Sequence, residues 1–103
     1  MMEDSISLRE LKTEDLTPFL NSPFTLSRPD GSESQLVLRE VRKHNYVTKL
    51  GREAFSVHFL GNQEEILPQS IYALNNPEMG RLEIFLVPIG RSEAGTEYEA
   101  VFA

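Results

Sequence analysis

The stretch from Leu67 to Gly90 constrains the fold more than any other part of the chain, because its pattern predicts two strands around a turn. Residues 75–80 supply the turn, with the asparagine, proline and glycine that favour tight turns. The strand after the turn is apolar on both faces, with Leu82, Ile84 and Leu86 on one side and Phe85, Val87 and Ile89 on the other. Such a strand is expected to be shielded from water, either centrally in a closed sheet or beneath the N-terminal helix. We therefore expect a compact β domain.

Alternating apolar residues elsewhere predict further strands around 24–26, 36–41, 55–59 and 98–102. The alternation slips by one residue near Arg39 and Glu40, which indicates a β-bulge. Pro88 cannot donate to a strand ladder, so pairing should weaken or bulge there. Residues 90–96 are expected to form a polar loop. About six strands with one helical lid predict an all-β fold, a small antiparallel barrel or sandwich.

The chain is expected to form a single β domain, 1–103, in which residues 1–22 are a helical or irregular segment packed on the sheet. Ser7 and Glu10 have capping-box spacing, and Pro18 fits the first turn of a short helix capped by Thr17. The best-buried side chains should be Phe55, Phe59, Tyr72, Ile84 and Leu86. Ser56 and His58 are expected on the opposite face of their strand, because successive side chains alternate between faces.

Composition excludes several classes of protein. With 103 residues and 40% apolar content, one core can close without cross-links. The absence of cysteine rules out disulfides and thiolate zinc sites and is compatible with the cytoplasmic location that we expect. The acidic start lacks the pattern of a secretory signal, and the longest apolar run is far short of the roughly 20 residues of a membrane span. A net charge of −6 argues against nucleic acid as a partner.

Catalytic and metal-binding patterns are not evident. His44 and His58 lack a second ligand at i+2 or i+4, and zinc normally takes three or four protein ligands. Glu97 and Glu99 share one face of the last strand, but exposed strand glutamates are usually solvated. We therefore expect no catalytic, cofactor-binding or metal-binding residues, no cofactor, and a protein that is not an enzyme.

Half of the ten basic residues lie within one stretch: Arg39, Arg42, Lys43, Lys49 and Arg52. This candidate interaction patch could dock on an acidic surface of a protein partner or of a second copy in a homo-oligomer, and would then contribute mainly orientation and association rate. The alternative is a solvated hairpin whose charges protect an edge strand from aggregation.

Several motifs resemble a family of small uncharacterised bacterial domains: Leu67–Gln69, Tyr72 with Leu74, Pro77–Gly80, Phe85–Gly90 and Tyr98–Phe102. Ser70 and Asn76 depart from the family pattern, which tends to have glycine and histidine there. The resemblance implies no activity, and it places such domains beside phage-tail-collar-like proteins.

Two function classes follow. The first is a non-enzymatic interaction or assembly module, an accessory of a phage-tail-like or fibre system. The alternative is a small-ligand-binding protein or enzyme that uses the barrel mouth, which would require a pocket lined by convergent polar groups.

Overall fold

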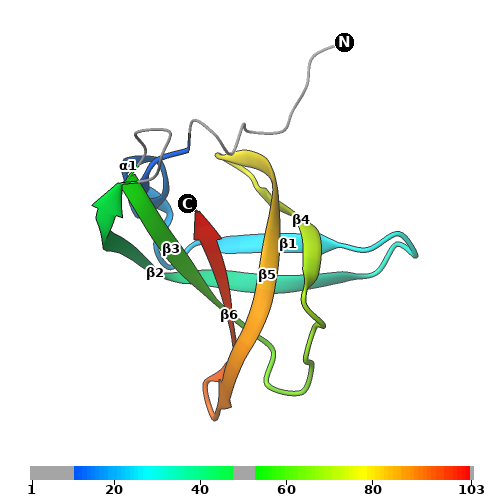
Figure 1. Ribbon diagram of the computed structural model, residues 1–103. Helices are drawn as coiled ribbons and strands as arrows, with labels where there is room; N and C mark the ends of the chain where they lie inside the picture. The colour runs from blue at the N-terminus through cyan, green and yellow to red at the C-terminus, as the bar shows by residue number, and fades with distance from the viewer. Residues whose placement is uncertain (1–10, 48–52, 103) are drawn as a thin grey trace.

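The computed structural model describes residues 11–47 and 53–102 (Figure 1). Six antiparallel strands form a closed barrel in the order β1-β2-β3-β6-β5-β4. The elements are α1 (Thr13–Leu16), η1 (Thr17–Phe19), β1 (Pro23–Ser27), β2 (Glu33–Val47), β3 (Glu53–Gly61), β4 (Ser70–Asn76), β5 (Gly80–Ser92) and β6 (Gly95–Phe102). The predicted all-β fold is confirmed, and the barrel is the correct alternative. Within the described ranges, no helix has the length and apolar character needed to cross a membrane.

The two helical turns that precede the barrel lie beside β2 (Figure 1). Pro18 stands in the first turn of η1, as predicted, but the capping residue is Leu16 and not Thr17. The Thr17 hydroxyl donates instead to a backbone oxygen of α1, which ties the two turns together. Leu11 and Leu16 belong to the hydrophobic core of the barrel. The capping box predicted at residues 7–10 lies outside the described residues.

Aromatic side chains from three strands, β1, β3 and β6, pack inside the barrel. Phe24 meets Phe59 edge to face at 5.4 Å between ring centroids, and Phe55 stacks on Phe102 at 4.7 Å. The predicted burial of Phe55, Phe59, Ile84 and Leu86 is confirmed. Tyr72 is only partly buried, because it lies where its hydroxyl can donate to the backbone oxygen of Pro68.

Both predicted irregularities are present. The register between β2 and β3 shifts between Leu38 and Glu40, and that between β5 and β6 shifts between Pro88 and Gly90. The loop expected at 90–96 is mostly strand, because the β5–β6 ribbon continues to the pair Ser92–Gly95. The polar composition of residues 90–96 favoured a loop, but an exposed two-stranded ribbon can form without an apolar face.

The outer face of the barrel departs from expectation. β5 is central in the closed sheet, but its outward side is not shielded: Phe85 and Ile89 are 50% and 46% exposed. Ser56 is on the face opposite Phe55, as predicted, yet it is fully buried. Within the described structure its hydroxyl has no hydrogen-bond partner.

The six strand pairings differ in length. β4 pairs with β5 over seven residues, whereas β1 pairs with β4 over three, from Ser27–Ala73 to Thr25–Asn75. This short β1–β4 seam is the one that closes the barrel.

The connection between β3 and β4 is held against the barrel by buried polar groups. The Tyr98 hydroxyl accepts the N–H of Leu67 at 2.9 Å and donates to the Glu65 carbonyl at 3.3 Å. The Thr96 hydroxyl contacts the same carbonyl at 3.0 Å. The Glu65 side chain forms an ion pair with Arg28 at the end of β1. The connection is therefore part of the packed structure although it contains no helix or strand.

Candidate functional site

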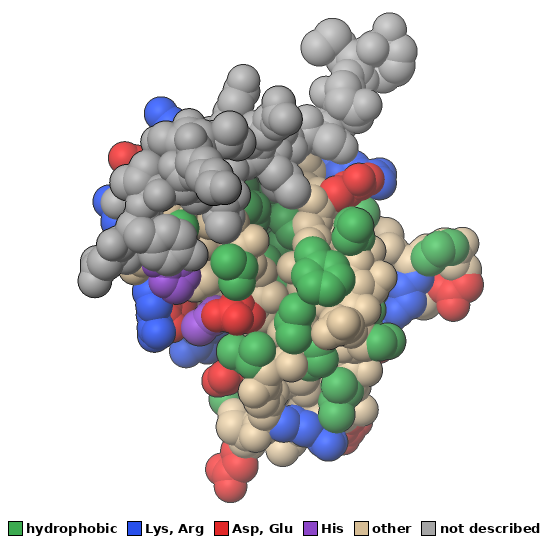
Figure 2. Space-filling view, viewed as in Figure 1, with side chains coloured by type: hydrophobic (Ala, Val, Ile, Leu, Met, Phe, Trp, Pro, Cys, Tyr) green, Lys and Arg blue, Asp and Glu red, His purple; other side chains and the backbone are tan. Residues whose placement is uncertain are grey.

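Large apolar side chains are exposed on the outer face of three neighbouring strands. Ile71 of β4 is 68% exposed and Val101 of β6 is 58% exposed, and Phe85 and Ile89 of β5 lie between them. We call these four residues the apolar stripe. Figure 2 shows apolar side chains gathered on the face over β4, β5 and β6.

Strand register produces the apolar stripe. Ile71 pairs directly with Phe85 across β4 and β5. On the other side of β5, Val87 pairs with Glu99 in an antiparallel ladder. Phe85 lies two residues before Val87, and Val101 lies two residues after Glu99. Side chains two residues apart share a face, so Phe85 and Val101 are neighbours on the outside. The stripe is thus a direct result of the two-faced apolar pattern of β5.

Next to the apolar stripe, a histidine lies between two carboxylates. Glu40, His58 and Glu99 are direct neighbours on β2, β3 and β6. The His58 Nδ1 lies 3.2 Å from a Glu40 oxygen, and its Nε2 lies 3.0 Å from a Glu99 oxygen. A neutral imidazole can donate to one of these carboxylates, whereas the imidazolium can donate to both.

Arg42 continues this row of charged groups. Its guanidinium donates to a Glu40 oxygen at 2.8 Å and 3.0 Å. This hydrogen bond from Arg42 holds the pKa of Glu40 below its ordinary value of 4.5, against the opposing effect of partial burial. The positive charge of Arg42 is therefore paired with a carboxylate of the same strand, β2.

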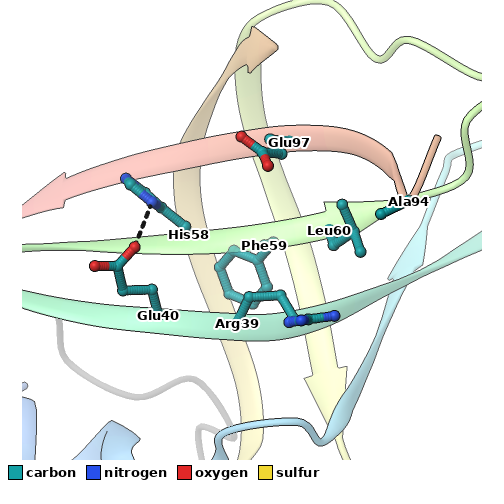
Figure 3. Close-up of a pocket in the computed structure, with 7 residues that line it drawn as sticks. All are labelled: Arg39, Glu40, His58, Phe59, Leu60, Ala94 and Glu97. Carbon is teal, nitrogen blue, oxygen red and sulfur yellow. Dashed lines mark ion pairs between the residues drawn. The ribbon is translucent and has the colours of Figure 1, made fainter. Parts of the chain in front are cut away.

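A charged groove of about 310 Å³ lies beside the histidine on the outer wall of the barrel, lined by residues that include Arg39, Glu40, His58, Leu60, Ala94 and Glu97 (Figure 3). Arg39 comes from β2 and Glu97 from β6, and Leu60 of β3 lies between them (Figure 3). The bulge in β2 gives Arg39 its position, because it is the extra residue that β3 leaves unpaired.

Three of the five members of the candidate interaction patch lie among the described residues. Arg39 lines the charged groove, and Arg42 is bound to Glu40. Lys43 is exposed on β2, where it pairs with Phe55 of β3. Lys49 and Arg52 lie outside the described residues, so whether the five cations form one surface stays a prediction.

The charged groove is suited to binding charged groups. Its lining residues supply an imidazole, two carboxylates and a guanidinium, but none of them carries a nucleophilic hydroxyl or thiol. His58 has one carboxylate at each nitrogen, so these three side chains do not converge on a single point. Among the described residues, no three His, Cys, Asp or Glu side chains are placed to hold a metal ion.

Sequence reasoning missed the association of Glu40, His58 and Glu99. A search for ligands at short spacing along the chain cannot find it, because the three residues are up to 59 positions apart and come from three strands. The available signal was the bulge at Arg39–Glu40, which turns Glu40 to the outer face beside His58.

Comparisons with known proteins give the family. The chain has no significant match among curated proteins or among solved structures. Residues 11–102 match a family described as a domain of unknown function, DUF6916, and this range includes all six strands of the barrel. The chain therefore belongs to the DUF6916 family.

Proposed function

We propose that this domain is a non-enzymatic interaction or assembly module that binds a protein partner through the apolar stripe. The observation that carries the proposal is the exposure of four large apolar side chains on adjacent strands. Scattered single apolar residues are normal on a protein surface, whereas contiguous patches mark interaction sites. Phe85 lies at the centre of the stripe, where an aromatic side chain contributes most to binding.

Several charged groups beside the apolar stripe are already paired within the domain. Near the start of β5, the Arg81 guanidinium lies 2.6 Å from a carboxylate oxygen of Glu83. On β6, the Glu99 carboxylate contacts His58. Covering an unpaired charge with a partner costs free energy, because the charge loses its hydration. These pairs lower that cost for a partner that covers the stripe.

The class of partner that we propose is a structural protein of a phage-tail-like or fibre assembly. This part of the proposal rests on the resemblance to domains that neighbour phage-tail-collar-like proteins. An exposed apolar docking face suits such an assembly, in which one subunit must add to the surface of another.

The test is a co-purification experiment from the native host with three forms of the domain. Phe85→Glu places a charge at the centre of the apolar stripe. Ile66→Glu is the matched control, because Ile66 is 53% exposed on the β3–β4 connection and so does not belong to the three strands that carry the stripe. Both variants should keep the circular dichroism spectrum and melting temperature of the wild type within a few degrees, since neither side chain fills the core.

We expect the wild type and Ile66→Glu to retain the same partner protein, and Phe85→Glu to lose it. A loss of affinity of at least about 10-fold is expected for a central aromatic residue. Equal capture by all three forms would contradict the proposal, and so would the lack of any captured protein at near-native concentrations.

A further inference from the structure

The charged groove contains two charges of opposite sign that none of the described residues neutralises. Among the described residues, Arg39 and Glu97 make no ion pair and no side-chain hydrogen bond. The other ionisable members of the groove, Glu40 and His58, contact each other. The groove therefore offers an available guanidinium on one side and an available carboxylate on the other.

We propose that the charged groove binds an extended peptide segment of the partner in which a basic and an acidic side chain flank an aliphatic one. The acidic side chain would pair with Arg39 and the basic one with Glu97, while the aliphatic one packs on Leu60 and Ala94. This inference rests on the proposed function and adds the chemistry by which a partner is selected.

The spacing of the strands supports this arrangement. Glu97 pairs with Leu60 across β6 and β3, and Arg39 lies on β2 at the other side of β3. Two neighbouring inter-strand distances separate β2 from β6 by about 10 Å. Side chains at positions i, i+2 and i+4 of an extended peptide share one face and span about 13 Å. A segment that crosses the three strands can therefore present its outer two side chains to Arg39 and Glu97 and its middle side chain to Leu60.

The charged groove is continuous with the apolar stripe. Glu97 pairs with Gly90, and Ile89 of the stripe directly precedes Gly90 on β5. Ala94, in the turn between β5 and β6, belongs to the groove. One partner can thus cover both surfaces, with affinity from the stripe and orientation from the groove.

The test uses three synthetic peptides and purified domain. The mixed probe is acetyl-Lys-Ser-Leu-Ser-Glu-amide, and the two controls carry lysine at both ends or glutamate at both ends. Binding is followed by the amide chemical shifts of Leu60 and Ala94 at low ionic strength. The wild type should bind the mixed probe most tightly. The preference should disappear in about 1 M salt, where the screening length is about 3 Å.

Charge reversals make the test specific. Glu97→Lys should transfer the preference to the probe with two glutamates, and Arg39→Glu should transfer it to the probe with two lysines. The double variant Arg39→Glu, Glu97→Arg should restore the preference for the mixed probe. Glu93→Lys is the matched control, because it makes the same charge change on the same hairpin outside the groove and should leave the preference as it is in the wild type.

Two results would overturn the inference. One is a wild type that prefers the doubly basic probe, which would show only the general attraction of a chain of net charge −6. The other is a Glu93→Lys variant that changes the preference as Glu97→Lys does. If one of these results is found while Phe85→Glu loses the partner in the co-purification experiment, peptide binding in the groove is refuted and the proposed function is retained. If the charge reversals switch the probe preference while Phe85→Glu still captures the partner fully, peptide binding in the groove is supported and the proposed function of the stripe is refuted.

Discussion

Replacing Tyr98 with phenylalanine removes a single oxygen atom from the centre of the structure and leaves one backbone donor without a partner. Tyr98 is 1% exposed, and its hydroxyl accepts the N–H of Leu67, a residue that is itself 5% exposed. A buried donor that loses its acceptor costs about 1–3 kcal/mol. The hydrogen bond to the Glu65 carbonyl is lost as well, but that oxygen lies 3.0 Å from the Thr96 hydroxyl, whose single proton can be donated either to it or to the Asn62 carbonyl. We expect the free energy of unfolding to fall by about 1–3 kcal/mol, with a decrease in melting temperature of about 5–20 °C.

Tyr72→Phe is the matched control for this prediction. Its hydroxyl also bonds to a backbone group of the β3–β4 connection, but the group is the exposed carbonyl of Pro68, which water can satisfy. We expect this variant to lose less than about 1 kcal/mol. Urea unfolding at constant m-value measures both losses, and amide exchange of Leu67 shows whether the loss in Tyr98→Phe is at the expected bond. Equal losses in the two variants, or an unchanged Leu67 exchange rate, would refute the reasoning.

Three further predictions concern other parts of the chain. Gly95→Ala should destabilise the domain far more than Gly31→Ala, because a Cβ at Gly95 would lie 2.1 Å from a backbone oxygen of β3, whereas a Cβ at Gly31 would meet nothing within 4 Å. Thermal melts of the two variants measure the difference, and similar melting temperatures would contradict the close packing at the β5–β6 turn. Truncation after Thr96 should leave an unfolded chain, because it removes two buried aromatic side chains that are each worth about 3–5 kcal/mol, and a folded spectrum for the truncated protein would be inconsistent with this. The pKa of Glu40 is lowered in the folded state, so Glu40 contributes stability that is present above its unfolded pKa and is lost as the pH falls through its folded pKa. Arg42→Ala should raise the folded-state pKa of Glu40 in a carbon-detected titration, and an unchanged pKa would exclude Arg42 as the cause.

The sequence contained most of the information needed for the barrel. Alternation located the strands, and the one-residue slip at Arg39–Glu40 located a bulge that the register confirms. The error lay in judging exposure from hydrophobicity. The outward side chains of β5 were expected to be covered because they are apolar, but Phe85 is half exposed. Periodicity tells which face a residue occupies, whereas coverage of that face depends on what packs there.

The candidate site was less predictable than the fold for a physical reason. Glu40, His58 and Glu99 become neighbours only through the register of three strands. Two of these strands, β3 and β6, are separated in the sequence by β4 and β5. The cation cluster was visible in the sequence, but the pairing of Arg42 with Glu40 depends on their side chains sharing a face of β2. Charge counting finds a cluster of like charges and does not tell which of them are already neutralised.

The short β1–β4 seam has a consequence for how the barrel opens. Its three pairs join residues 46 to 50 positions apart, from Ser27–Ala73 to Thr25–Asn75. Their formation therefore closes a long loop but gains only three paired positions. We expect the seam to form late in folding and to be the first pairing lost in native-state fluctuations. A closed barrel has no free edge, but each opening of the seam exposes two, on β1 and on β4. Another chain can pair with those edges, so the route to strand exchange and aggregation of this domain begins at its shortest ladder.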